Sequence, residues 1–252
     1  MREAKLLFDA VSLTAKTGFL TKSIFREIAK PESERSEQRF WQALNSSQLF
    51  QPLRFIKYNI EVLRLTSKGR QMALGFGTPV VSSPHIANVE HDEMAAFVGL
   101  RLQQSGLIRS WSSEAILKQE IQRDGISAAE GPKGKYPDIL IELEVTGPAV
   151  RVAIEIERTG KPQKRYDEII YSYGGWKNLD AVIFAFNLKY IESAIRRSMS
   201  RSHYPQTGPE VIFTDLKSFI DNPSNAKLKV RSEDQNIATI VKSIATKRKV
   251  AA

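Results

Sequence analysis

The sequence predicts an α/β protein with a small helical unit that carries a β-hairpin, followed by a larger unit built on a mixed β-sheet. Three observations lead to this expectation. Apolar residues follow helical spacing through most of residues 5–46, and two alternating, strand-like runs come next. Residues 75–84 then interrupt the pattern with two glycines, two prolines and two serines. Beyond them, unbroken apolar runs alternate with helical segments, as in a sheet covered on both faces.

The composition is that of a soluble globular protein, with 42% hydrophobic and 26% charged residues in a chain of 252. No apolar run approaches the roughly 18 to 20 residues of a spanning helix, and the first residues lack the apolar stretch of a signal peptide. We therefore expect a cytoplasmic protein with no membrane partner. Because the chain has no cysteine and three histidines, carboxylates would have to hold most of any metal site, which favours Mg²⁺ or Mn²⁺.

The net charge of +9 favours a polyanionic partner, and its distribution favours the first unit. Residues 1–80 hold thirteen lysines and arginines against seven acidic residues, a net of +6. A second basic segment is the tail, residues 226–252, which ends in Lys247-Arg248-Lys249. The tail is expected either to contact phosphates or to be a solvated terminus.

In the first unit, residues 1–78, the spacing predicts three helices over 5–15, 22–29 and 32–46, with Thr21 capping the second. Alternation predicts a hairpin between Leu49 and Leu65, followed by a fourth helix. This order resembles the winged helix-turn-helix domain, whose third helix can enter the major groove of double-stranded DNA. The DNA contacts that the resemblance implies are Arg35, Arg39, Arg54 and Lys57. Two features weigh against this reading: winged helices also serve as protein-protein modules, and Glu32, Glu34 and Glu37 oppose dense phosphate contact.

The second unit, residues 85–225, begins with a predicted helix over 92–104 and an extended run over 107–117. Pro137 can begin a strand but cannot lie centrally in one, so Asp138 is expected near a strand start. The returning strand over 150–158 places Val152, Ile154 and Ile156 on one face and Ala153, Glu155 and Glu157 on the other. A helix over 163–173, a strand over 180–186, another helix and a strand over 210–214 complete the order.

Paired strands would bring Asp138 close to Glu155 and Glu157, beside a hydrophobic sheet. Three such carboxylates are costly together unless something positive neutralises them. A divalent ion would do so, and it could activate a water molecule for phosphodiester cleavage. The alternative is that the three carboxylates form ordinary salt bridges with Arg151, Arg158 or Lys164.

The order helix, three strands, helix, strand resembles the core of the PD-(D/E)xK nuclease superfamily. Within it, the chain is similar to the replication-relaxation family and to MobC-type plasmid mobilisation relaxases. The motifs that carry this resemblance are Trp111-Ser-Ser-Glu114, Tyr136-Pro137-Asp138, Glu155-Ile156-Glu157-Arg158-Thr159 and Arg165-Tyr166-x4-Tyr171, with His91-Asp92-Glu93. The resemblance implies a metal held by Asp138 and Glu155 with Glu93 or Glu114, and it implies an accessory mobilisation or coupling protein as a partner.

Glu157 stands where the superfamily usually has lysine, the residue expected to orient or deprotonate the attacking water. Lys161 or Lys164 could reach the site from the next helix, and we expect Lys164 to belong to the catalytic set. A tyrosine nucleophile is another route, with Tyr166, Tyr171 and Tyr173 nearby.

Three functions follow from these motifs. The first is a metal-dependent relaxase that nicks one DNA strand at a plasmid transfer origin. The second is a non-catalytic replication or transcription regulator with a degenerate nuclease fold, and the third is a restriction-type enzyme that cuts both strands.

Overall fold

The computed structural model describes residues 2–55, 60–81, 89–124, 135–143, 149–176, 178–202, 204–205, 208–230, 233–240, 243–244 and 246. The chain divides into two compact units, Met1–Phe97 and Val98–Ala252. Their boundary lies within helix α5 (Val89–Gln104). The linker expected between residues 78 and 85 lies partly outside the described ranges, so those domain limits stay a prediction.

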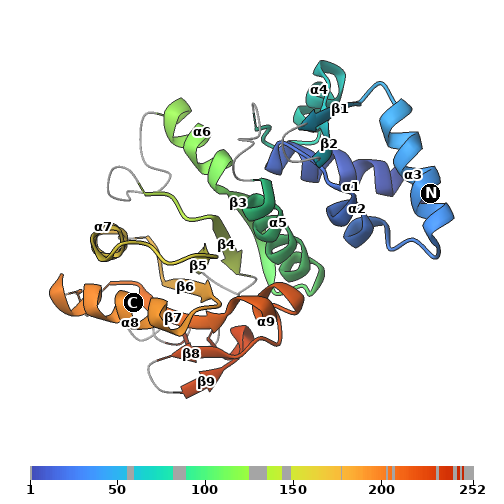
Figure 1. Ribbon diagram of the computed structural model, residues 1–252. Helices are drawn as coiled ribbons and strands as arrows, with labels where there is room; N and C mark the ends of the chain where they lie inside the picture. Colours follow the sequence, from blue (N-terminus) through green and yellow to red (C-terminus); the bar gives the residue numbers. More distant parts are fainter. Residues whose placement is uncertain are drawn as a thin grey trace. The chain divides into compact units, whose positions relative to one another are not determined.

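The first unit has the winged helix-turn-helix order that the sequence predicts (Figure 1). Its elements are α1 (Arg2–Thr17), α2 (Lys22–Ala29), α3 (Glu34–Ser46), β1 (Phe50–Phe55), β2 (Ile60–Leu65) and α4 (Ser67–Gly75). The strands form an antiparallel hairpin, and two hydrogen bonds, of 2.7 and 2.9 Å, join the backbones of Leu20 and Leu63. This bridge ties the hairpin to the turn between α1 and α2.

Side-chain caps set where the short helices of this unit begin. The Thr21 hydroxyl accepts a hydrogen bond from the Ile24 N–H at the start of α2, as predicted. Ser33 and Ser36 form a capping box at the start of α3. The core beneath them is apolar and fully buried, and includes Phe19, Phe25 and Ile24. Capping therefore fixes the start of α3, and burial of Trp41 and Leu44 fixes which face of α3 is turned inward.

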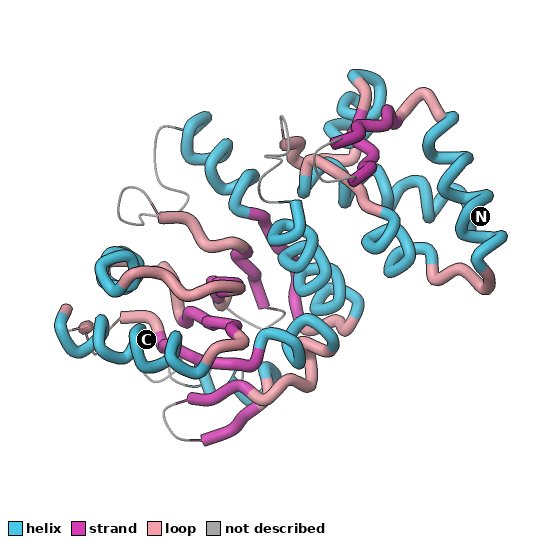
Figure 2. Tube along the Cα trace, in the orientation of Figure 1, coloured by secondary structure: helices cyan, strands magenta, loops and turns pink. Residues whose placement is uncertain are grey.

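The second unit is built on a seven-stranded mixed sheet in the order β3-β4-β5-β6-β7-β8-β9, which confirms the predicted fold class (Figures 1 and 2). Its strands are β3 (Ile108–Ser113), β4 (Ile139–Leu143), β5 (Arg151–Glu157), β6 (Ala181–Phe186), β7 (Glu210–Asp215), β8 (Leu228–Val230) and β9 (Glu233–Gln235). The β5-β6 and β6-β7 pairs are parallel, and the other pairs are antiparallel.

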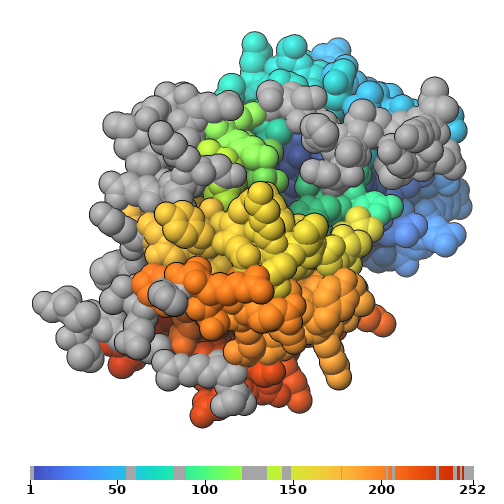
Figure 3. Space-filling view, turned by 60° about the vertical axis from the view of Figure 1, so that its left-hand side comes forward, coloured from blue at the N-terminus to red at the C-terminus, as the bar shows by residue number. Residues whose placement is uncertain are grey.

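Two helices, α7 (Gln163–Gly174) and α8 (Lys189–Arg201), cover one face of this sheet (Figure 1). They pack against each other, and the yellow and orange parts of the chain lie side by side in Figure 3. Their apolar sides join Val182, Phe184 and Phe213 of the central strands in one buried cluster. Ala153 of β5 belongs to the same cluster, so the face of β5 that carries Glu155 and Glu157 is turned toward α7. The predicted alternation along β5 is therefore confirmed.

The structure departs from the sequence prediction in three places. The extended run predicted over 107–117 ends at Ser113, because α6 (Glu114–Asp124) begins there; its Glu114-Lys118 ion pair has the i, i+4 spacing that favours a helix. A short helix, α9 (Leu216–Asp221), follows β7. The sheet also continues past residue 225, since β8 and β9 use the first part of the predicted tail, whereas residues 247–252 lie outside the described chain.

Candidate functional site

Asp138 lies beside the glutamates of β5 because of the direction of the strands. It directly precedes β4, and β4 runs antiparallel to β5, so the start of one strand meets the end of the other. The Ile156 N–H donates a 2.7 Å hydrogen bond to Asp138 Oδ2. This bond holds the Asp138 carboxylate beside the end of β5, the part of the strand that carries Glu155 and Glu157.

Glu155 is almost fully buried, with 1% of its surface exposed, and both of its carboxylate oxygens are engaged. The Tyr173 hydroxyl donates to Oε1, and the ammonium of Lys135 lies 2.8 Å from Oε2. Burial raises the pKa of Glu155 to about 7, against the opposing effect of Lys135, and the nearby charge of Asp138 raises it further. Glu155 is therefore held by two defined partners in a dry position.

Lys135 supplies the positive charge that the acidic cluster requires. Burial alone would lower the pKa of its ammonium, but the charges of Glu155, Asp138 and Glu114 outweigh that effect and raise the pKa above its ordinary value. Lys135 is therefore charged at neutral pH. Glu155, Asp138 and Glu114, whose charges act on this ammonium, are three of the four carboxylates predicted to bind a metal; the fourth is Glu93.

Glu157 is paired with a lysine from the loop that follows β5. It is 1% exposed, and Lys161 Nζ lies 2.5 Å from its Oε1. Burial raises the pKa of Glu157, and Lys161 opposes the shift. Of the two lysines considered from sequence, Lys161 reaches the cluster, whereas Lys164 lies exposed on α7. The catalytic role expected for Lys164 stays a prediction that this placement does not favour.

The donors at this site suit a hard divalent cation in kind, because they are carboxylate oxygens. In this structure, however, the carboxylates of Glu155 and Glu157 are paired with the ammonium groups of Lys135 and Lys161. No group of three acidic or histidine side chains in the described part of the chain is placed to hold a metal together. An ion bound by Asp138 and Glu155 would have to displace the Lys135 ammonium from the Glu155 carboxylate.

Two of the remaining predicted ligands have local partners. Glu114 begins α6, where its carboxylate lies 2.7 Å from Lys118 and its N–H donates to the Asp138 carbonyl. Glu93 belongs to the first unit, where it accepts a hydrogen bond from the Thr21 hydroxyl. Neighbouring His91 contacts Asp92 at 3.3 Å. The structure therefore brings Glu114 to the cluster and gives Glu93 a partner in the helical unit.

The three candidate tyrosines differ sharply in exposure. Tyr166 and Tyr173 are fully buried, and burial raises the pKa of both phenols, which disfavours the phenolate needed for attack on phosphorus. Tyr173 instead donates its hydroxyl to Glu155, and the Tyr166 oxygen accepts the Lys161 N–H at 3.2 Å. Tyr171 is 74% exposed. Two of the three are therefore positioning residues for the cluster.

The predicted DNA-contacting side chains can be followed on the first unit. Arg35 and Arg39 are exposed on α3, whereas Lys57 lies outside the described residues. Arg54 is exposed on β1 and lies opposite Glu61 in the hairpin register. Glu37, which the sequence counted against phosphate contact, is buried, and Arg26 donates a 2.6 Å hydrogen bond to its carboxylate. Its charge is thus neutralised inside the unit.

Lys135 is the site residue that sequence reasoning missed. It ends a polar, glycine-rich stretch that reads as a loop, and no periodicity marks its role. Its position could have indicated its role, because Lys135 lies three residues before Asp138, next to an acidic cluster that requires a positive charge.

Comparisons with known proteins add little to this geometry. No known sequence family and no curated protein matches the chain. Among solved structures, the restriction endonuclease FokI bound to DNA matches at 13% identity and a TM-score of 0.29, over 87% of this chain and 43% of that chain. The chain thus spans less than half of that protein's length, and a likeness of this extent is too slight to establish an activity.

The elements themselves define the class of protein. A unit with the winged helix-turn-helix order of elements precedes a mixed α/β sheet unit with the order helix, three strands, helix, strand, and α6 lies between the first two of those strands. None of the helices in the described ranges has the length and apolarity needed to cross a membrane. Membership in the replication-relaxation or MobC-type family stays a prediction.

Proposed function

We propose that the chain is a metal-dependent DNA-cleaving protein, a relaxase that nicks one strand at a plasmid transfer origin. The observation that supports the proposal is the cluster at the edge of β4 and β5. Asp138, Glu155 and Glu157 meet there with two lysines, in a fold whose other unit has an exposed basic helix face. Carboxylates and amines at one sheet edge are the groups that phosphodiester cleavage uses.

The residues of the cluster have separate roles in this proposal. Asp138 and Glu155 would hold Mg²⁺ or Mn²⁺, which supplies charge neutralisation at the phosphate and an acidified water. The Ile156 N–H and the Tyr173 hydroxyl orient those two carboxylates. Lys161, at the partly exposed end of the cluster, can donate a hydrogen bond from Nζ to the attacking water or to a phosphate oxygen. In this proposal Lys161 has the role of the lysine that the nuclease superfamily usually carries at the position of Glu157.

The test is a supercoiled plasmid that carries the transfer origin of the native replicon, incubated with the full chain and Mg²⁺ or Mn²⁺. We expect open-circular product from the wild type and at least a hundredfold less from Asp138→Ala. Asp234→Ala, which removes an exposed carboxylate from β9, serves as the matched control and should nick normally. Equal nicking by wild type and Asp138→Ala would overturn the proposal, and a linear product would indicate a restriction-type enzyme.

A second candidate function is favoured by the ion pairs themselves. Lys135 and Lys161 balance Glu155 and Glu157 without any bound ion, as in a nuclease fold kept for DNA binding alone. A non-catalytic regulator would bind its operator equally well in EDTA and in Mn²⁺, and it would leave the plasmid supercoiled. Gel-shift titrations in the two buffers, run beside the nicking assay, distinguish the candidates.

A further inference from the structure

The connection between β6 and α8 exposes two large apolar side chains at the edge of the sheet that carries the acidic cluster. Leu188 is 40% exposed and Tyr190 is 56% exposed. Strands β5 and β6 are parallel, and their last residues, Glu157 and Phe186, are partners in the register, so this connection leaves the sheet beside the loop that follows Glu157. In open α/β sheets, ligands bind outside the carboxyl ends of the strands. Both apolar side chains therefore lie where a ligand of this sheet is expected.

Tyr190 is held against the loop that carries Lys161. A methyl group at Gly160 would overlap the Tyr190 hydroxyl and would lie 2.6 Å from two carbons of its ring, so the ring fits because this position has no side chain. The Lys161 N–H donates to the Tyr166 hydroxyl, and the Tyr190 phenol adds to the raised pKa of Tyr166, of which burial is the main cause. The hydroxyl end of Tyr190 is thus fixed at the rim of the cluster, while more than half of the residue is exposed.

Cations border this exposed ring. Lys189 precedes it in the chain and is exposed, and Lys161, whose side chain is 36% exposed, follows the glycine on which the ring lies. Aromatic rings that stack on bases, together with cations that follow the backbone, are the means by which proteins hold single nucleic-acid strands. The surface beside the cluster therefore has the groups that hold one nucleotide, a ring for its base and amines for the phosphates.

The ring can be used only by a base that is out of the duplex stack. In an intact duplex, each base is covered on both faces by its neighbours, so a side chain from outside cannot stack on it. Enzymes that act on a base of a duplex turn that nucleotide out of the stack or use an unpaired strand. Tyr190 therefore fits a base that is unpaired or turned out beside the phosphate that is cut.

We infer that Tyr190 stacks on one unpaired base of the cleaved strand and thereby positions the scissile phosphate at the cluster, with Lys189 contacting a neighbouring phosphate. Leu188 extends the exposed apolar surface of the same connection. Gly160 is a positioning residue, because a side chain there would displace the ring. The inference rests on the proposed function and adds to it the residue that holds the substrate.

The experiment measures binding of two short, labelled single strands to the full chain in EDTA by fluorescence anisotropy. One strand is oligothymidine, and the other carries the same phosphates on abasic sugars. The wild type should bind the thymidine strand about tenfold more tightly than the abasic strand, and Tyr190→Leu should remove most of that preference. Tyr190→Phe keeps the ring and should keep the preference. Tyr171→Leu, which removes another exposed tyrosine of this unit, is the matched control and should bind both strands as the wild type does.

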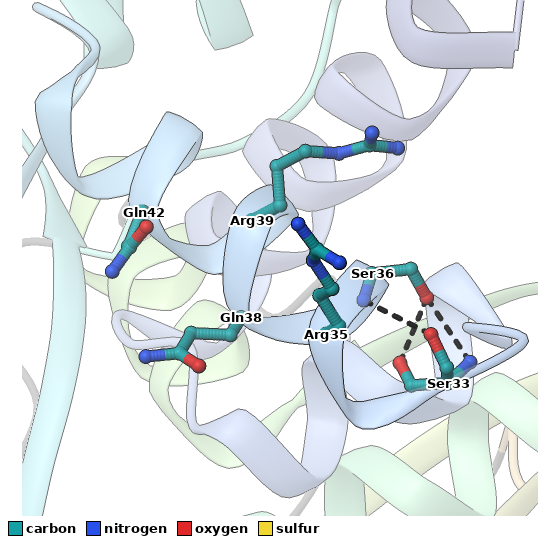
Figure 4. A pocket seen from close by; sticks show the side chains of 6 residues that line it. All are labelled: Ser33, Arg35, Ser36, Gln38, Arg39 and Gln42. Atoms are coloured by element: carbon teal, nitrogen blue, oxygen red, sulfur yellow. Dashed lines mark hydrogen bonds between the residues drawn. The ribbon is translucent and has the colours of Figure 1, made fainter.

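Gly160→Ala tests the placement of the ring. It should weaken binding of the thymidine strand as Tyr190→Leu does, and it should add little to Tyr190→Leu in the double variant, because the ring that it displaces is then absent. Arg39→Ala, on the α3 face drawn in Figure 4, changes a predicted duplex contact of the other unit. It should leave the preference for thymidine unchanged.

Several outcomes would overturn the inference. Equal binding of the two strands by the wild type, or an unchanged preference in Tyr190→Leu, would show that the ring holds no base. A loss in Tyr190→Phe as large as that in Tyr190→Leu would assign the effect to the hydroxyl and exclude stacking. Since the measurement needs no cleavage, a preference that depends on Tyr190 and persists without nicking in Mn²⁺ separates failure of the proposed activity from failure of this inference.

Discussion

Lys135 determines the charge state of the candidate site. Its ammonium lies 2.8 Å from Glu155 and is under the influence of Asp138 and Glu114, so its removal leaves buried carboxylates without compensation. We expect Lys135→Met to lower the free energy of unfolding in EDTA by about 3 kcal/mol. We also expect Mn²⁺ to raise the melting temperature of the variant more than that of the wild type, because the ion then meets no competing ammonium.

Thermal unfolding with and without Mn²⁺ checks this expectation, and Lys164→Met provides the control. Lys164 is exposed on α7, so its loss should change neither the stability nor the response to the ion. An identical Mn²⁺ response in Lys135→Met and wild type would show that Lys135 does not occupy the place of a metal.

Glu155 should make stability depend on pH. Its pKa is raised by burial to about 7 in the folded chain, against an ordinary value of 4.5. A raised pKa means that the folded state binds the proton more tightly, so this stabilisation is fully present below pH 4.5 and is lost as the pH rises to about 7. The loss is on the order of 3 kcal/mol.

Urea unfolding at a series of pH values in EDTA tests this for wild type and Glu155→Gln. The glutamine cannot titrate, so the difference between the two proteins should change across that window and level off on either side. A constant difference from pH 4 to pH 8 would contradict the expected shift.

Residue by residue, the sequence indicated the acidic side of this site, but of its two lysines it offered only Lys161, as one of two alternatives, and it did not indicate Lys135. Asp138, Glu155 and Glu157 follow from Pro137 and from strict alternation along β5, which are local signals. Lys135 and Lys161 lie in loops, where no period fixes the direction of a side chain. Their contacts depend on how the chain returns to the sheet, and that is a long-range property.

At the scale of elements, α4 packs closely against the segment before β1, and Gly69 lies at the point of closest approach. A methyl group at Gly69 would lie 2.3 Å from the carbonyl oxygen of Leu49, which is held by a 2.9 Å bond from the Thr66 N–H. Because a backbone oxygen cannot yield as a side chain can, we expect Gly69→Ala to destabilise the first unit by about 2 kcal/mol. Gly75, at the end of the same helix, faces open space, so Gly75→Ala should be neutral or slightly stabilising.

Equilibrium unfolding of the two glycine variants measures this contrast directly. Equal stability of Gly69→Ala and Gly75→Ala would mean that the contact between α4 and the segment before β1 is loose. The pair is matched in chemistry, helix and size of change, so the difference isolates the close approach.

Elements with a strong local period were predictable, and elements that depend on context were not. The bounds of α2 agree with its prediction because Thr21 caps it, and the β1–β2 hairpin follows from alternation. The start of α6 was misread as strand, since Ile116 and Leu117 continue an apolar run whose conformation the neighbours decide. Strand β8 was missed because three residues are too few for a period to show.

At the scale of the whole molecule, each unit has its own buried core, which includes Phe19 and Phe25 in one and Tyr173 and Phe184 in the other. We therefore expect two unfolding transitions in calorimetry in EDTA. Gly69→Ala should lower one transition by about 8 °C, and Lys135→Met should lower only the other, because each change lies within one core. A single transition that both variants shift together would show that α5, which continues from one unit into the other, couples them into one cooperative structure.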